Sequence, residues 1–299
     1  MGSRELYLTM PSDGPRVLRD GTVPLRGQSR ITCFVHGYNV EAGEAKSSFD
    51  RFITNVRAEA DIPNNRAVPM LDGSRAWRLY WPAYARLGRN RGLISALTYP
   101  WHVADVGHWA NAFAEYLSME FRGFEETPVD VTFVAHSLGC RLILETLRVK
   151  LEDRCTSWSV HLVFLMAAAI PVRLVRYGGR LFSSALHAKR RCVAYSPIDP
   201  VLQVAFRAGQ LGQGGVLPTA IGSSGQPVDL WTDRLCTLNG HSGYFSDRAT
   251  ARLLAAALGL RTRRQLGDRT IMPKLTVIRK LASVATLPLR ILRGRRVGD

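Results

Sequence analysis

The stretch FVAHSLGCR, residues 133 to 141, places a serine between two small residues. Ala135 stands two positions before Ser137, where the common pattern has glycine, and Gly139 stands two positions after it. A serine in this setting, between an apolar strand and a helix, is typical of a sharp turn that exposes the hydroxyl at the end of the strand. The start of the helix turns N–H groups toward that oxygen. The pattern predicts a nucleophile at Ser137; a serine that only caps a helix is the alternative.

A serine nucleophile needs a base that accepts its proton and a carboxylate that orients the base. Downstream of Ser137, Asp199 lies in the turn after the apolar run CVAY, and His241 lies in a loop just before the last expected helix. Serine, acid and histidine follow in this order when a triad is built on an α/β sheet. We therefore predict Ser137, Asp199 and His241 as nucleophile, acid and base. Asp229 and Asp233 are the alternative acids.

Acyl transfer also needs backbone N–H donors for the oxyanion of the intermediate. Leu138, directly after the serine, is the predicted first donor. The second is expected from the loop HGYN after the strand ITCFV, where Gly37 allows close backbone approach and the amide of Tyr38 is the predicted donor. Asn39 is the alternative donor, and a simple glycine turn is the alternative interpretation of the loop.

These residues require a sheet whose strands end at one edge. Apolar β-like runs alternate with segments of helical period along the chain. The expected strands are 31–35, 77–81, 129–135, 160–167, 192–195 and 228–231. Helices are expected around 49–56 and 109–117, from 138 to 151, and from an N-cap at Ser246 to a position before Gly259. The alternation predicts an α/β fold with a mostly parallel central sheet and helices on both faces.

The motifs CFVHGYNV, VAHSLGCRL, YSPIDP and GHSGYF, in this order, resemble the α/β-hydrolase superfamily, most closely the bacterial alpha/beta hydrolases of unknown function (the DUF900-like group). The resemblance covers about residues 28 to 258. It implies a serine hydrolase whose triad falls on Ser137, Asp199 and His241. Relatives carry a Pro-Asp pair after the strand that here ends in AAAIP, and this chain has no acid there.

The function expected from motifs and resemblance together is hydrolysis of carboxylic esters by an esterase or lipase-like enzyme, with no cofactor and no metal. A lipid-directed acyltransferase or phospholipase at a membrane surface, and a non-catalytic binding module on the same fold, are the alternatives. The expected partner is a small-molecule or lipid ester.

The substrate pocket is predicted only in outline, from an aromatic-rich stretch between the HGYN loop and the serine. The expected core residues are Trp77, Trp81 and Trp109. The candidate pocket residues are His36, Asn39, His136, Tyr84, Tyr99 and Trp101. The glycine-rich segment 209–225 is a candidate lid over the site.

Length and composition favour one globular domain, 1–260, followed by a basic tail, 261–299. The tail holds 11 basic and 2 acidic residues, and so carries +9 of the net charge of +16. Its apolar residues fall close to one helical face, which makes peripheral contact with an anionic membrane one hypothesis. A tail packed on the domain, a disordered end and an acidic partner are the others. Nucleic-acid binding is not expected, because no recognised motif accompanies the charge.

The cysteines and the first residues indicate the compartment. Five cysteines form no CxxC pair and four of them stand beside apolar runs, so we expect buried thiols in a reducing environment. The first residues contain no apolar signal segment, and no apolar run is long enough to span a bilayer. We therefore expect a cytoplasmic protein, with the inner membrane face as a candidate site of peripheral contact.

Overall fold

The computed structural model describes residues 3–9, 15–20, 30–38, 40–60, 62, 68, 70–82, 93–210 and 218–260. All of them fall within Met1–Gly267, the first of two units into which the chain divides. The predicted tail, residues 211–217 of the predicted lid and the pocket candidates Asn39 and Tyr84 lie outside the described residues. For Tyr99 and Trp101 only the backbone is described. The predictions made for these parts stay predictions.

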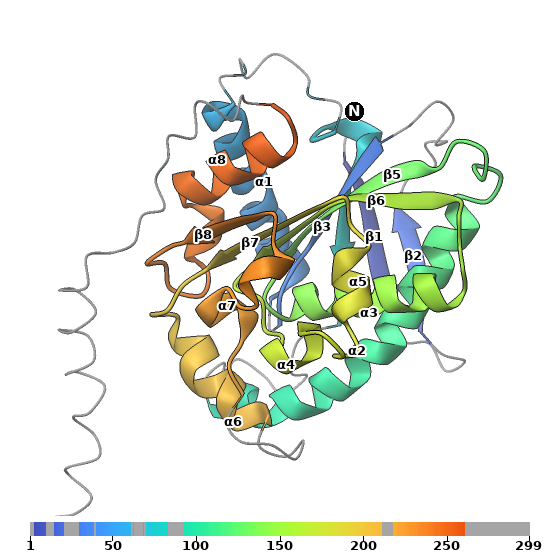
Figure 1. Cartoon of the computed structure of the whole chain (residues 1–299). Helices are drawn as coiled ribbons and strands as arrows, with labels where there is room; N and C mark the ends of the chain where they lie inside the picture. The colour runs from blue at the N-terminus through green and yellow to red at the C-terminus, as the bar shows by residue number, and fades with distance from the viewer. Residues whose placement is uncertain are drawn as a thin grey trace, which may run out of the picture. The chain divides into compact units, whose positions relative to one another are not determined.

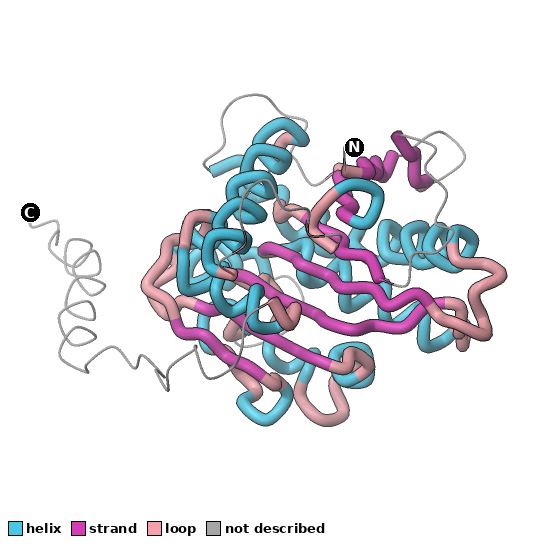
Figure 2. Tube along the Cα trace, turned by 90° about the horizontal axis from the view of Figure 1, so that it is seen from above, coloured by secondary structure: helices cyan, strands magenta, loops and turns pink. Residues whose placement is uncertain are grey.

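Within the described residues, eight strands form one sheet in the order β2-β1-β4-β3-β5-β6-β7-β8 (Figures 1 and 2). The strands are β1 Arg4–Thr9, β2 Arg16–Asp20, β3 Arg30–Val35, β4 Ala76–Tyr80, β5 Val129–His136, β6 Trp158–Met166, β7 Arg190–Tyr195 and β8 Asp233–Cys236. Only β1 and β2 pair antiparallel in this sheet. The other neighbours pair parallel. Their carboxyl ends therefore meet at one edge, which is where the predicted site residues stand.

Helices cover both faces of the sheet (Figure 1). They are α1 Ala42–Glu59, α2 Leu93–Glu120, α3 Leu138–Glu152, α4 Val172–Val175, α5 Phe182–Leu186, α6 Phe206–Gln210, α7 Ile221–Ser224 and α8 Arg248–Ala257. Helices α1 and α8 pack together on one face, and α2 and α3 pack together on the other. The central strands β3 and β5 are buried at nearly every position, as expected for strands covered on both sides. The predicted fold class is confirmed.

Three expected elements differ from the structure. Residues 228–231 are not a strand: Val228–Leu230 form a short 3₁₀ turn, and β8 begins at Asp233. The run is apolar because Leu230 and Trp231 are buried in the core although they lie in and after a turn. The edge strand β8 is half-exposed and therefore more polar. Helix α8 is capped by Asp247, one residue after the expected Ser246, through an Oδ2 that accepts from the amide of Thr250 at 2.9 Å.

Helix α2 is the third difference. The sequence predicts a helix around 109–117, but α2 begins at Leu93 and continues through Pro100, so Tyr99 and Trp101 also lie in it. A proline removes one backbone hydrogen bond and kinks a helix. The helix continues beyond it because its later turns bury an apolar face that includes Val106 and Phe113.

The predicted core residues Trp77, Trp81 and Trp109 are buried, as expected. All five cysteines are free; Cys155 and Cys236 are half-buried rather than buried. Among the described helices, none has the length and apolar character that crossing a membrane requires.

Candidate active site

Ser137 occupies the junction between β5 and α3 with a strained backbone. Its φ of 54° and ψ of −123° lie in a region that non-glycine residues rarely adopt. The strand and loop beside it hold this conformation: the amide of Ser137 donates to the carbonyl of Met166 at 2.9 Å, and its carbonyl accepts from the amide of Ala169 at 3.1 Å. The sharp turn expected from the sequence is therefore present, and the end of β6 fixes it.

Glycine is required both in this turn, at Gly139, and in the turn after β3, at Gly37, because the two backbones approach closely. A Cβ atom on Gly139 would lie 2.3 Å from the carbonyl oxygen of His36. A Cβ atom on Gly37 would lie 2.7 Å from the Cβ of Ser137. Since β3 and β5 are neighbouring parallel strands, the turns that follow them lie against each other. The turn that contains His36 and Gly37, here called the HG turn, thus forms one wall beside the serine.

Ser137, His241 and Asp199 form one hydrogen-bonded chain. The Nε2 of His241 lies 2.8 Å from the Oγ of Ser137, and its Nδ1 lies 2.8 Å from the Oδ2 of Asp199. Asp199 stands in the turn after β7, and His241 stands in the loop after β8. The Asp199 side chain is 0% exposed and that of His241 is 20% exposed. The ring therefore joins the fully buried carboxylate to the hydroxyl of Ser137, a residue that is 4% exposed.

The carboxylate of Asp199 is oriented by the backbone. Its Oδ1 accepts from the amides of Val201 at 3.0 Å and Leu202 at 3.2 Å, which leaves Oδ2 for the imidazole. An ionised carboxylate only accepts, so the Nδ1 of His241 carries the proton in this contact. The Nε2 lone pair is then directed at Ser137, as a general base requires.

The two alternative acids lie in other contacts. Asp233, at the start of β8, accepts from the Nη2 of Arg190 at 3.0 Å. Asp229 is exposed in the 3₁₀ turn before that strand. Asp199 is the carboxylate that contacts His241.

A second histidine, His136, makes a hydrogen bond to the loop that carries His241. It is buried, and its Nε2 lies 2.7 Å from the backbone carbonyl of His241. A carbonyl only accepts, so this nitrogen carries the proton. Burial lowers the pKa of His136 to about 3, so the ring is neutral near pH 7. His136, a sequence candidate for the pocket, thus contacts the main chain of the predicted base.

A third histidine, His36, ties the HG turn to the end of β4. Its Nε2 accepts from the amide of Trp81 at 3.1 Å, and its Nδ1 lies 2.7 Å from the carbonyl of Gly37. The indole of Trp81 donates to the carbonyl of His36 at 3.0 Å. Burial lowers the pKa of His36 to about 4. Nothing in the sequence pattern indicates this role, because the partner lies 45 residues away.

Of the two predicted oxyanion donors, one follows Ser137 directly in the chain and the other lies in the turn after the neighbouring strand β3. Leu138 is the first residue of α3, and Tyr38 follows Gly37 in the turn that contacts Ser137. The Tyr38 side chain is half-buried and packs against the core. Within the described residues, no three His, Cys, Asp or Glu side chains are grouped to hold a metal ion.

No protein-family model matches the chain, and no curated protein matches it. Solved structures of esterases are similar to it at low identity. Carboxyl esterase 2 from the mycorrhizal fungus Tuber melanosporum is 12% identical, over 86% of this chain and 85% of that one, with a TM-score of 0.39. An esterase/lipase from an uncultured bacterium is 10% identical, over 86% and 85%, with a TM-score of 0.39. A hyperthermophilic esterase from the archaeon Pyrobaculum calidifontis is 12% identical, over 85% and 84%, with a TM-score of 0.40.

The strand order, the parallel sheet and the sharp turn at Ser137 decide the fold. The chain has the α/β-hydrolase fold. The narrower resemblance to the DUF900-like bacterial group stays a prediction.

Proposed function

We propose that this α/β-hydrolase-fold protein is a serine hydrolase that cleaves carboxylic esters. The observation that carries the proposal is the hydrogen-bonded chain from Asp199 through His241 to Ser137, at the strained turn after β5. A serine hydroxyl becomes a useful nucleophile when a neutral imidazole accepts its proton and a carboxylate stabilises the resulting imidazolium. Each of these requirements has a residue in the right contact.

In the proposed reaction, the Oγ of Ser137 attacks the ester carbonyl carbon while its proton passes to the Nε2 of His241. The carbonyl oxygen becomes an oxyanion, which the amides of Leu138 and Tyr38 stabilise. The C–O bond to the alcohol then breaks, and the alcohol leaves with the proton from His241. A water molecule attacks the acyl-serine by the same route, with His241 as base and then acid, and releases the carboxylic acid. The reaction needs no metal and no cofactor.

One further observation favours an apolar acyl group or a lipid as substrate. The turn that carries Asp199, the short helix Val201–Ala205 after it and the loop that carries His241 also hold exposed apolar side chains, namely Ile198, Val201, Val204 and Leu238. Isolated exposed apolar residues are common, but these four lie within five residues of Asp199 or His241 in the chain, which favours apolar surface near the triad. A lipid-directed acyltransferase or phospholipase is therefore the second candidate. A panel of p-nitrophenyl esters from acetate to palmitate tests it, because an apolar acyl site raises kcat/KM with chain length.

The nucleophile itself is tested with a fluorophosphonate probe. We expect the wild-type protein to be labelled and Ser137→Ala to lose labelling and to lose ester turnover, on the order of 10⁶-fold as in other triad enzymes. The matched control is Ser242→Ala, an exposed serine next to His241, which should be labelled normally. Labelling that survives Ser137→Ala would refute the mechanism. A folded wild-type protein that takes no label and cleaves no ester would support the non-catalytic binding module.

A further inference from the structure

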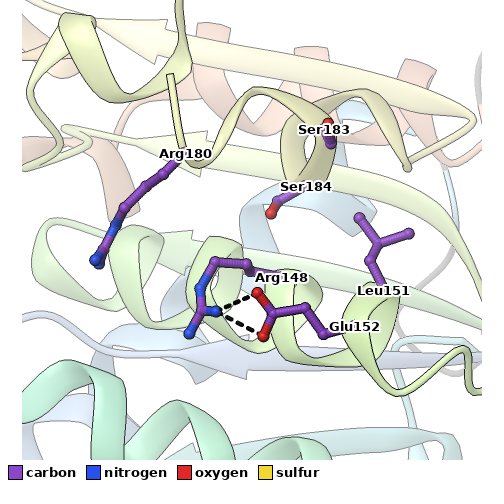
Figure 3. Close-up of a pocket in the computed structure, with 6 residues that line it drawn as sticks. All are labelled: Arg148, Leu151, Glu152, Arg180, Ser183 and Ser184. Carbon is purple, nitrogen blue, oxygen red and sulfur yellow. Dashed lines mark hydrogen bonds and ion pairs between the residues drawn. The ribbon is translucent and has the colours of Figure 1, made fainter. Parts of the chain in front are cut away.

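Helix α3 borders a pocket at the end opposite to Ser137. The pocket has a volume of about 530 Å³ and lies between α3 and α5 (Figure 3). Its lining residues are Arg148, Leu151, Glu152, Arg180, Ser183 and Ser184. Ten residues of helix separate Leu138 from Arg148, which corresponds to about 15 Å at 1.5 Å per residue. The pocket is therefore separate from the candidate active site.

Ser184 supplies a buried hydroxyl that has no partner. The residue is 1% exposed, and its Oγ makes no hydrogen bond. Figure 3 shows this hydroxyl pointing from α5 into the space in front of Arg148 and Glu152. A buried polar group without a partner is unfavourable and rare in folded proteins. An acceptor atom of a ligand in the pocket would satisfy it.

Two arginines supply further donors. The buried carboxylate of Glu145 accepts from the Nε of Arg148 at 3.2 Å and from the Nη2 of Arg180. The Nη1 of Arg148 contacts both oxygens of Glu152 at 2.5 and 2.6 Å. These contacts leave the Nη2 of Arg148 and the Nε and Nη1 of Arg180 without a hydrogen bond to the described part of the chain. The two guanidinium groups thus retain donors for a ligand.

Two carboxylates oppose an anion here: the buried Glu145, which pairs with both arginines, and Glu152, which lines the pocket and is easily displaced. The side chain of Glu152 is 59% exposed, and its contact with Arg148 is a surface pair between positions i and i+4. Exposed pairs of this kind add little stability. An anion that binds Arg148 more strongly can therefore replace this carboxylate.

The part of the chain that follows α3 and supplies Arg180, Ser183 and Ser184 is basic. Residues 154 to 198 contain seven arginines and lysines and no aspartate or glutamate. Lys189 and Arg190 pair with acids elsewhere in the domain, and four of the arginines are exposed, namely Arg154, Arg173, Arg176 and Arg180. A surface with charge of one sign attracts ligands of the opposite sign. The positive charge and the unpaired donors therefore both favour an anionic ligand.

We propose that this pocket binds the phosphate group of a small organic phosphomonoester. Phosphate offers several oxygens in a tetrahedral arrangement, which suits two arginine forks and a serine hydroxyl. A carboxylate offers only two oxygens in one plane. Leu151 gives the organic part of the ligand an apolar surface. The proposal is independent of the reaction proposed for Ser137.

Titration calorimetry of the full-length protein with phenyl phosphate and with inorganic phosphate tests the proposal. We expect one site for either probe, and the same affinity in Ser137→Ala. Ser184→Ala and Arg180→Gln should each weaken binding about tenfold, the loss expected for one hydrogen bond to a charged group. Glu152→Gln should strengthen binding, because Arg148 is then released. Arg176→Gln, an exposed arginine outside the lining, is the control and should bind normally.

The result is decisive because Ser184→Ala and Arg180→Gln should weaken binding whereas Glu152→Gln should strengthen it. Ser184→Ala removes an unpaired buried hydroxyl, so its melting temperature should not fall, and a loss of binding cannot come from unfolding. Absence of binding in the wild type overturns the proposal. It is also overturned if Arg176→Gln weakens binding as much as Arg180→Gln while Ser184→Ala has no effect, since general surface charge then explains the binding. Benzoate binding as tightly as phenyl phosphate would overturn the assignment to phosphate.

Discussion

Two carboxylates in the domain are equally buried and differ in their partners. Asp199 is 0% exposed, and Glu145, in the middle of α3, is 1% exposed. Asp199 is held by two backbone amides and an imidazole, whereas Glu145 is held by arginines, among them Arg148 and Arg180. An imidazole can accept and return a proton near neutral pH, and a guanidinium cannot. Burial alone therefore does not indicate a catalytic carboxylate; what distinguishes the two is whether the side chain that contacts the carboxylate can transfer a proton.

The largest effect that this contrast predicts is loss of turnover in Asp199→Asn. Asparagine keeps one oxygen for the amides of Val201 and Leu202, but its other atom is a donor and no longer accepts from the Nδ1 of His241. We expect kcat to fall by about 10⁴, as when a triad acid is lost elsewhere, with little change in melting temperature. Steady-state kinetics on a soluble p-nitrophenyl ester measure it.

Asp233→Asn is the matched control for that variant. Asp233 contacts Arg190 at the start of β8, whereas the loop of His241 follows the other end of this strand. Its replacement should leave kcat near the wild-type value. If Asp233→Asn abolished turnover and Asp199→Asn did not, the acid would have been assigned to the wrong residue.

The same contrast predicts the opposite outcome for Glu145→Gln. This change leaves the nearly buried guanidinium of Arg141 without its counter-charge and removes one carboxylate from Arg148 and Arg180. Breaking a buried ion pair in this way lowers the free energy of unfolding by about 3 kcal/mol. Urea denaturation measures it, and kcat should stay unchanged. Glu152→Gln, an exposed partner of Arg148, is the control and should cost about 0.5 kcal/mol or less.

The sequence predicts much of the site because its motifs fix local shape. A serine between Ala135 and Gly139 dictates a tight strand-to-helix turn, and the order of acid and histidine follows from the parallel sheet. The structure brings Ser137, His241 and Asp199 together as that order requires.

The remaining features depend on contacts between distant segments or on polar edge strands. The strands β2 and β8 form the sheet edges and β1 lies next to β2; β1 and β8 are only partly buried, so their apolar pattern is weak. The roles of His36 and His136 depend on partners 45 and 105 residues away, which periodicity does not reveal. Ser184 and Arg180 likewise meet Arg148 only through the packing of α5 on α3.

Acid should destabilise the fold through the two buried histidines. The pKa values of His36 and His136 are about 4 and about 3 in the folded protein, below the value of about 6.5 for an exposed histidine. Below pH 6.5 the unfolded chain binds protons that the folded protein does not, so the free energy of unfolding falls as pH falls toward 4 and 3. At pH 5 the loss is on the order of 2 kcal/mol per histidine.

Urea denaturation at pH 7.5 and pH 5 measures this loss. The control is His136→Gln, which removes one of the two titrating groups and should make the loss on acidification about half as large. Equal stability of the wild-type protein at both pH values would contradict the assignment of buried, neutral rings to His36 and His136.

The smallest effect sharpens the contrast between the two neighbouring histidines. The rings of His136 and His241 lie 4.9 Å apart, yet only His241 reaches Ser137, and His136 holds the carbonyl of His241. His136→Phe removes that hydrogen bond and leaves the loop of His241 less firmly placed, so kcat should fall about tenfold with KM unchanged. The rate of fluorophosphonate labelling should fall in parallel, because acylation needs the same base. His136→Gln restores a donor and should recover part of both rates, which a merely structural role would not produce. The control is His161→Phe, a half-buried histidine in β6, which should keep both rates. Unchanged labelling in His136→Phe would mean that the loop of His241 is held in place without this hydrogen bond.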